Sequence, residues 1–170
     1  MNRLYVFLYI LIILSCNKDK NDSVFIDENE NFDINYSVDL NPTGDFSLII
    51  IKDSIEFLDN GDQIGIFDNN GVIESCFPDT IPPCNSPQYG ETLVGSGIWN
   101  NSQMEISVIL SLDFSSFNGP ILNGAVKTNP INLKVWKVQD DQEYNTDIIF
   151  EQGDGTFNSI LSVISSIELK

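Results

Sequence analysis

The stretch that decides the fold is residues 60–71, which read Asn-Gly-Asp-Gln-Ile-Gly-Ile-Phe-Asp-Asn-Asn-Gly. An Asn-Gly pair at each end is a strong turn signal, and the short apolar run between them, residues 63–68, is typical of a β-strand. The pattern continues in both directions, because short alternating or β-branched apolar runs are separated by Gly, Pro, Asn and Asp. Further strands are predicted over residues 32–40, 46–51, 93–99, 104–112, 131–136, 146–151 and 160–169.

These strands predict an all-β protein, built as a single antiparallel β-sandwich of about eight strands. Residues 93–99 and 104–112 flank a short turn at Asn100-Asn101, so we expect them to form a hairpin. Ile160, Ile164 and Ile167 also fit helical spacing. A minor helical turn is therefore expected near the C-terminus, ahead of a terminal strand.

The N-terminal residues predict export. A positive start, an apolar run over residues 4–14 and Ser15 before Cys16 describe a secretory signal over residues 1–15. The run is shorter than the roughly 20 residues that a helix needs to cross a membrane. Ile13-Leu14-Ser15-Cys16 resembles the lipobox of bacterial lipoproteins, which implies lipidation at Cys16. The alternative is an ordinary cleaved signal followed by an incidental cysteine.

Residues 16–31 are almost all polar or charged, which is typical of a flexible acidic tether, and residues 32–170 remain as one domain. Lys18-Asp19 is similar to the charged export signal with which some Gram-negative bacteria send lipoproteins to the outer face of the outer membrane. We therefore expect a lipid-anchored outer-membrane protein exposed at the cell surface. The periplasmic face is the alternative location.

The composition argues against several functions. The chain has 25 acidic and 8 basic side chains and a net charge of -17, which repels phosphate backbones and predicts no nucleic-acid partner. It has no histidine, so it lacks the side chain that titrates near neutrality and the commonest transition-metal ligand. The glutamates are scattered and no nucleophile-elbow motif is present. We therefore expect a protein that is not an enzyme.

Two cysteines remain once Cys16 carries lipid, and an oxidising compartment favours a disulfide between Cys76 and Cys84. The loop between them contains prolines, so it is a poor strand or helix. A bridge across so short a loop would contribute roughly 2.5 kcal/mol to stability. Two unpaired thiols are the alternative.

Asp59, Asp62 and Asp68, with asparagines between them, form the densest cluster of oxygen ligands in the predicted domain. Calcium takes six to eight oxygen ligands in irregular geometry, so this cluster predicts a weak calcium site (Ca²⁺). The alternative is that these are ordinary turn residues, whose side chains hydrogen-bond the neighbouring backbone.

Trp136 and Trp99 are the candidate ligand residues, because β-sandwich carbohydrate-binding modules use aromatic platforms. Trp136 is out of phase with the apolar positions of residues 131–135, so it faces away from them. If that face is exposed to solvent, the tryptophan indicates a ligand site; if it faces a second sheet, it indicates packing.

Four segments, residues 61–68, 93–99, 133–136 and 153–158, resemble a poorly characterised β-sandwich module. They read Gly-Asp-Gln-Ile-Gly-Ile-Phe-Asp, Leu-Val-Gly-Ser-Gly-Ile-Trp, Leu-Lys-Val-Trp and Gly-Asp-Gly-Thr-Phe-Asn. The module recurs in large secreted and surface proteins of bacteria that use type IX secretion. The resemblance spans residues 46–169, implies fold and location only, and carries no catalytic residues.

The expected function is a binding, adhesion or structural role at the cell surface, with the membrane as a partner through the lipid. A glycan or an envelope protein is the expected second partner. The alternative function is a carbohydrate-binding module that acts beside a polysaccharide-uptake system.

Overall fold

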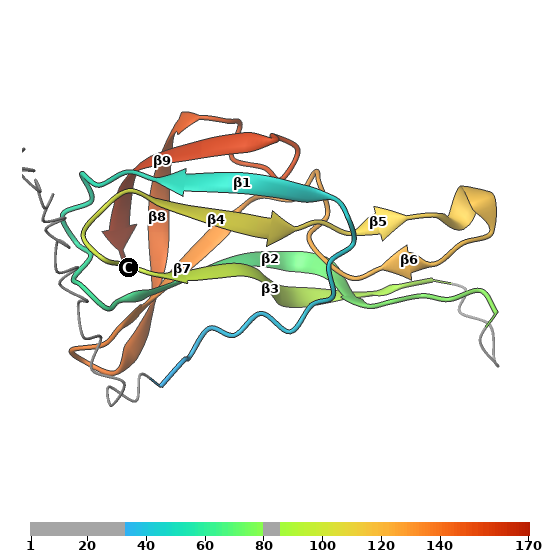
Figure 1. The fold of residues 1–170 in the computed structure, drawn as a ribbon, viewed down its shortest axis with the longest axis horizontal. Helices are drawn as coiled ribbons and strands as arrows, with labels where there is room; N and C mark the ends of the chain where they lie inside the picture. The colour runs from blue at the N-terminus through green and yellow to red at the C-terminus, as the bar shows by residue number, and fades with distance from the viewer. Residues whose placement is uncertain (1–32, 80–85) are drawn as a thin grey trace, which may run out of the picture. The chain divides into compact units, whose positions relative to one another are not determined.

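The computed structural model describes residues 33–79 and 86–170, which belong to one unit, Asp33–Lys170. That unit is all-β, as the sequence predicts (Figure 1). Its elements are β1 (Phe46–Ile51), β2 (Gln63–Glu74), β3 (Gln88–Ile98), β4 (Met104–Ile109), β5 (Leu112–Asp113), a 3₁₀ turn η1 (Ser115–Phe117), β6 (Ile121–Leu122), β7 (Asn132–Lys137), β8 (Gln142–Gln152) and β9 (Leu161–Leu169).

The main sheet has seven strands in the order β3-β2-β7-β8-β9-β1-β4, and β5 and β6 form a separate pair. β8 is shared: Gln142–Asn145 pair with β7, and the rest of the strand pairs with β9. The sheet therefore curls round β8 until its two edge strands, β3 and β4, approach each other. The result is nearly closed, like a barrel (Figure 1).

The predicted hairpin of residues 93–99 and 104–112 is wrong. β3 pairs with β2, and β4 pairs with β1, so the turn between β3 and β4 joins the two opposite edges of the sheet. The edges pack through side chains: a Cβ added at Gly97 would meet Met104 Cε, and one added at Gly95 would lie 2.8 Å from Ile106 Cγ2 and 3.0 Å from the Ser107 carbonyl oxygen. Gly97 and Gly95 therefore let the two edges approach closely, a role that alternation in the sequence does not reveal.

The sheet is mixed, so the prediction of an antiparallel sheet is only partly correct. Residues 48–51 of β1 pair in parallel with residues 161–164 of β9. Alternation specifies which face of a strand is buried, but it carries no information on strand direction. Closure of the sheet sets the direction of β1 against β9.

Residues 32–40 are not a strand in their described part. From Asp33 the segment crosses β2 without pairing as a strand. Its backbone is hydrogen-bonded instead by the side chain of Gln63. The N–H groups of Asn35 and Tyr36 donate to Gln63 Oε1 at 2.8 and 3.3 Å. The predicted alternation is present because Tyr36 is buried against the sheet, but the segment is a strap and not a strand.

Two local predictions also need correction. The Asn70-Gly71 pair does not end a strand, because β2 continues to Glu74 through a bulge, in which Asp68 Oδ1 accepts the Asn70 N–H at 2.9 Å. That local bond is typical of turns and of bulges alike. No helical turn precedes β9 in the described chain; irregular turns lead directly into the strand, which is parallel-paired from Leu161.

The core lies inside the curled sheet. It is made mainly of isoleucine, valine, leucine and aromatic side chains from six strands of the sheet and the segments between them, and β8 adds the partly buried Ile148 and Phe150. The most deeply buried large side chains of the core are Trp99, Phe157, Ile49, Ile51, Ile64, Ile66, Ile106, Leu110, Ile164 and Ile167.

No helix in the described ranges is long and apolar enough to cross a membrane.

Candidate binding groove

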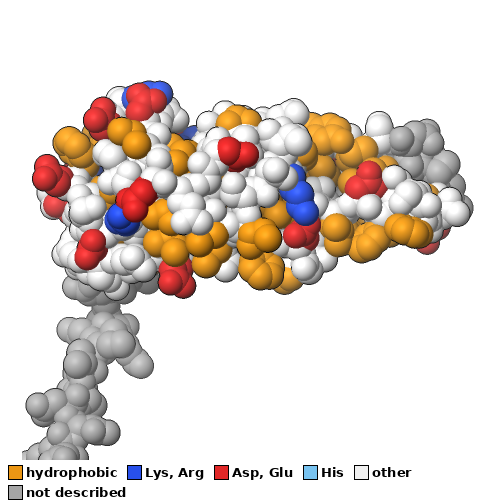
Figure 2. All heavy atoms as spheres, turned by 90° about the horizontal axis from the view of Figure 1, so that it is seen from above, with side chains coloured by type: hydrophobic (Ala, Val, Ile, Leu, Met, Phe, Trp, Pro, Cys, Tyr) orange, Lys and Arg blue, Asp and Glu red, His pale blue; other side chains and the backbone are white. Residues whose placement is uncertain are grey.

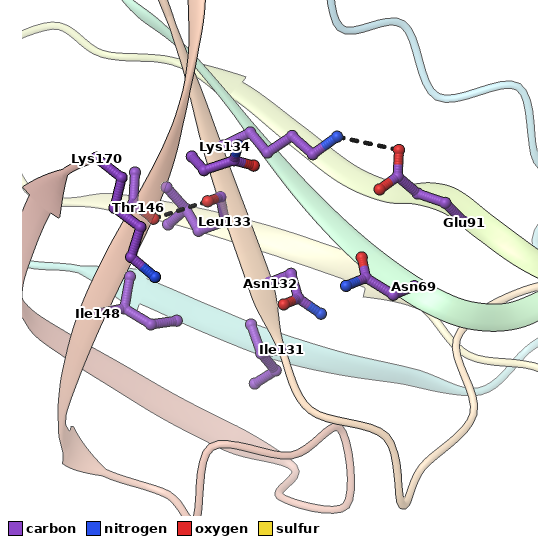
Figure 3. Close-up of a pocket in the computed structure, with 10 residues that line it drawn as sticks. Asn69, Glu91, Ile131, Asn132, Leu133, Lys134, Thr146, Ile148 and Lys170 are labelled. Carbon is purple, nitrogen blue, oxygen red and sulfur yellow. Dashed lines mark hydrogen bonds and ion pairs between the residues drawn. The ribbon is translucent and has the colours of Figure 1, made fainter.

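A groove opens where β8 leaves β7 to join β9 (Figure 3). β7 and β8 pair only from Lys134 with Asn145 to Lys137 with Gln142, so beyond Lys134 the two strands diverge. The space between them holds about 380 Å³, and its apolar lining is Ile131, Leu133 and Ile148. That volume lies in the range of roughly 300–1,000 Å³ that small-molecule sites occupy.

Polar side chains from three strands surround this apolar floor. Asn69 comes from β2, Asn132 from β7 and Asn145 from β8. Figure 3 shows the Asn69 and Asn132 side chains pointing toward one another across the groove. Within residues 33–79 and 86–170, the Asn69 and Asn145 carboxamides make no hydrogen bond, and Asn132 spends one N–H on the Pro130 carbonyl at 3.2 Å.

The two lysines of the groove are each paired with carboxylates. Lys134 Nζ lies 3.0 Å from Glu91 Oε1 and 3.5 Å from Glu143 Oε1, and Lys170 Nζ lies 2.6 Å from Asp147 Oδ1. Burial lowers the pKa of Lys134, but the hydrogen bond with Glu91 and the nearby carboxylate charges outweigh it, so the pKa is raised. The groove therefore holds neutralised cations and not a net positive charge.

The Lys134 ammonium also connects the groove to the strap. It lies 4.5 Å from the centre of the Phe67 ring, and that ring contacts Tyr36 edge-on at 5.6 Å. Tyr36 donates its hydroxyl hydrogen to Glu143 Oε2 at 2.8 Å. Gly65 makes room for this stack, since a Cβ there would lie 2.6 Å from the Phe67 ring. The strap thus holds one wall of the groove in place.

The predicted calcium ligands are held by nitrogen donors. Lys137 Nζ lies 2.6 Å from Asp59 Oδ2 and 2.7 Å from Asp62 Oδ2, and it also donates to the Phe57 carbonyl at 2.9 Å. Burial lowers the pKa of Lys137, but the hydrogen bonds and charges of the two aspartates outweigh it and raise the pKa. The ammonium occupies the position between the two carboxylates that the sequence assigned to a cation.

Asp68 lies apart from that pair and is also fully buried. Its oxygens accept the Val126 N–H at 2.8 Å and the Asn129 side-chain amide at 2.9 and 3.0 Å, besides the Asn70 N–H. In the part of the chain that the structure describes, no three His, Cys, Asp or Glu side chains gather as a metal site. Calcium binding at Asp59, Asp62 and Asp68 therefore stays a prediction from the sequence.

The two tryptophans have different environments. Trp99 is 1% exposed and belongs to the core, so it is a packing residue and not part of a platform. Trp136 is half-buried on the outer face of β7, the face that carries Asn132 and Lys134. It does not line the groove, but it is the next residue after Lys134 on the same face of β7.

The cysteine predictions fall mainly on residues outside the described ranges. Cys16 and Cys84 both lie outside them, so lipidation at Cys16 and the Cys76–Cys84 disulfide stay predictions. Cys76 itself is buried and pairs by backbone with Ile121, through N–H to carbonyl distances of 2.7 and 2.8 Å. Any bridge at Cys76 would therefore start from an ordered position.

A projecting arm, residues 111–123, contains β5, η1 and β6. Phe117 at its tip is 82% exposed and Phe114 is 38% exposed. Backbone bonds shape the tip: Gly119 and Phe117 donate to the Phe114 carbonyl, both at 2.9 Å. Hydrophobic side chains lie over this end of the molecule in Figure 2. The arm therefore presents exposed aromatic side chains on an ordered turn.

No pattern in the sequence predicts the groove. Its asparagines lie in strands whose apolar and polar residues alternate, and in such strands a polar residue is an ordinary outward-facing one. The three asparagines come together only in the folded sheet, at the point where β8 changes its pairing partner from β7 to β9. Lys137 was also missed as the partner of Asp62, although a lysine at a buried-phase strand position is itself unusual.

Comparison with known proteins returns no match, whether the chain is compared with protein families, with curated proteins or with solved structures.

Proposed function

We propose that this chain is a non-enzymatic lipoprotein, held at the surface of the outer membrane by lipid on Cys16, whose β-domain binds partners there. The observation that carries the proposal is the position of the two ends of the domain. The described chain begins, in blue, toward the end that also holds the C-terminus and the β7–β8 turn, and the arm projects from the opposite end (Figure 1). A tether that enters the domain at its first residues leaves the exposed Phe117 of the arm available to a partner.

Lipid is a sufficient anchor on physical grounds. Each buried CH₂ of an acyl chain contributes about 0.8 kcal/mol, so a multiply acylated Cys16 holds a protein on a membrane without a spanning segment. The acidic residues 16–31 would keep the domain away from an anionic membrane surface. We also retain the β-sandwich as a proposal, with the β3-β2-β7 and β9-β1-β4 parts of the sheet as its two layers.

The anchor is tested with Cys16→Ser in the full chain. The variant should move from the membrane fraction to the soluble fraction and lose metabolic labelling by fatty acid, whereas the tether variant Asn29→Ala should keep both. Protease shaving of intact cells should remove the wild-type domain. A Cys16→Ser variant that stays in the membrane, or a wild type that resists shaving while a known surface protein is cut, would contradict the proposal.

The groove favours a second candidate function, a carbohydrate-binding module. Exposed amides around an apolar floor suit a hydroxyl-rich ligand, and they provide this without the tryptophan platform that the sequence suggested. The test is glycan binding by the purified chain.

A further inference from the structure

The groove at the β7–β8 divergence is lined by both aliphatic side chains and carboxamides. Ile148 is its half-buried aliphatic residue, Ile131 and Leu133 border it as core side chains that are 5% and 3% exposed, and its walls carry carboxamides. A carboxamide offers two N–H donors and one carbonyl acceptor. Since the amides of Asn69 and Asn145 make no hydrogen bond in the described chain, their donors and acceptors are available to a ligand.

The charges of the groove select against anions. Lys134 and Lys170 are the cations there, and each is already within 3.0 Å of a carboxylate oxygen. An anionic ligand would have to displace Glu91 or Asp147, and it would approach a chain of net charge -17. Phosphates, nucleotides and sulfated or uronic sugars are therefore disfavoured relative to a neutral ligand.

A neutral saccharide matches both linings. Its hydroxyl groups both donate and accept, as carboxamides do, and its C–H faces are apolar enough to lie on aliphatic side chains. The ion pair of Lys134 with Glu91 at the rim offers further hydrogen-bond partners to sugar hydroxyls (Figure 3). A purely apolar ligand would leave the amides unpaired, and a charged one would meet the carboxylates.

We propose that this groove is a binding site for a neutral saccharide, held by Asn69, Asn132 and Asn145 beside Ile148. The proposal deepens the carbohydrate-binding candidate and rests on it. It assigns recognition to the asparagines and not to Trp136, which lies outside the groove.

The test uses the full chain in dodecylphosphocholine micelles on an array of neutral, uronic and sulfated oligosaccharides. Wild type should bind at least one neutral oligosaccharide. Asn132→Ala combined with Asn145→Ala should weaken that binding at least tenfold. Gln103→Ala, which removes an exposed amide from the β3–β4 turn, should leave it unchanged, and circular dichroism should report the same fold for all three proteins.

Three results would overturn the proposal: no binding to any neutral oligosaccharide, a preference for sulfated or uronic sugars, or binding that survives the double substitution. Loss on Trp136→Ala with full binding in the asparagine variant would return the site to the tryptophan face. None of these results touches the lipid anchor, because the Cys16→Ser and shaving experiments measure location and not ligand. The two proposals can therefore fail separately.

Discussion

Asp62 and Asp68 lie six positions apart and are both fully buried, yet the structure satisfies them in different ways. Asp62 is held by an ammonium, from Lys137, together with the N–H groups of Asp59 and Val138. Within the described residues, the hydrogen bonds to Asp68 all come from amide N–H groups. With 8 basic side chains for 25 acidic ones, the chain neutralises one buried carboxylate with a cation and solvates the other with uncharged donors.

The difference teaches that an aspartate in a turn-rich stretch of sequence does not by itself indicate whether its partner is a cation or an amide. A buried ion pair costs desolvation of two ions, and removal of one partner leaves the other charge uncompensated. Amide donors cost less to desolvate than an ammonium does, and they fix the geometry of a loop, as Asn129 and Val126 do beside the β2 bulge. The two sites should therefore differ in their response to substitution and to pH.

The largest effect is expected at the charged site. Asp62→Leu leaves the Lys137 ammonium with only the half-exposed Asp59 as a charge partner, and it should destabilise the fold by about 3–5 kcal/mol. Urea unfolding followed by circular dichroism measures this. The double variant Asp62→Leu with Lys137→Met removes both charges, so it should recover much of the loss. A single variant within about 1 kcal/mol of wild type would show that the pair is dispensable.

The amide site should respond less. Asp68→Asn replaces one acceptor oxygen by an NH₂ group that faces the N–H donors of Asn129 or Val126, with an expected cost of about 1–3 kcal/mol. Asp53→Asn, at an exposed position, is the matched control and should change stability by less than about 0.5 kcal/mol. If Asp68→Asn costs as much as Asp62→Leu, the distinction between the two sites is wrong.

Alkaline pH should separate the sites further. The pKa of Lys137 is raised above its ordinary 10.5, and burial with the Glu143 hydrogen bond raises the pKa of Tyr36 above its ordinary 10.0. Above about pH 10 the folded chain therefore binds more protons than the unfolded chain, so stability is complete below that pH and falls as pH rises. Each fully coupled group contributes a slope of up to about 1.4 kcal/mol per pH unit.

Urea midpoints from pH 8 to 11 measure this dependence. Lys137→Met and Tyr36→Phe should each flatten the fall of stability at alkaline pH. Asp68→Asn should keep the wild-type slope, because the described residues that hydrogen-bond Asp68 are not titratable. An unchanged slope in both of the first two variants would contradict the assigned causes.

The smallest effect is expected at the arm, which differs from both buried sites. Phe117 is 82% exposed, so Phe117→Ser should change stability by less than about 0.5 kcal/mol. Gly119→Ala is the informative neighbour, since a Cβ there would lie 2.6 Å from Phe114 Cβ and should distort the tip. A thermal midpoint lowered by Phe117→Ser as much as by Gly119→Ala would mean that Phe117 packs against the domain.

Part of the fold could be predicted from local pattern. The strands near residues 46–51, 63–68 and 131–136 were correct because alternation and β-branched residues mark a buried strand face, whatever its partner is. The strap and the β3–β4 connection were wrong, because alternation also occurs when a segment lies on a sheet without pairing, and because a short turn can join opposite edges. The candidate site was not predictable, since its asparagines are brought together by three different strands.

The sequence by itself determined the all-β class, the acidic character, and the turns with Gly61 and Gly153 at positive φ, because these depend on residue type and near neighbours. Tertiary structure alone decided that β1 runs parallel to β9, that Lys137 reaches Asp62, and that β8 changes partner after Asn145. These contacts join residues as far apart in the sequence as Leu48 and Leu161. Their energies depend on which surfaces meet when the sheet curls, and no local pattern encodes that meeting.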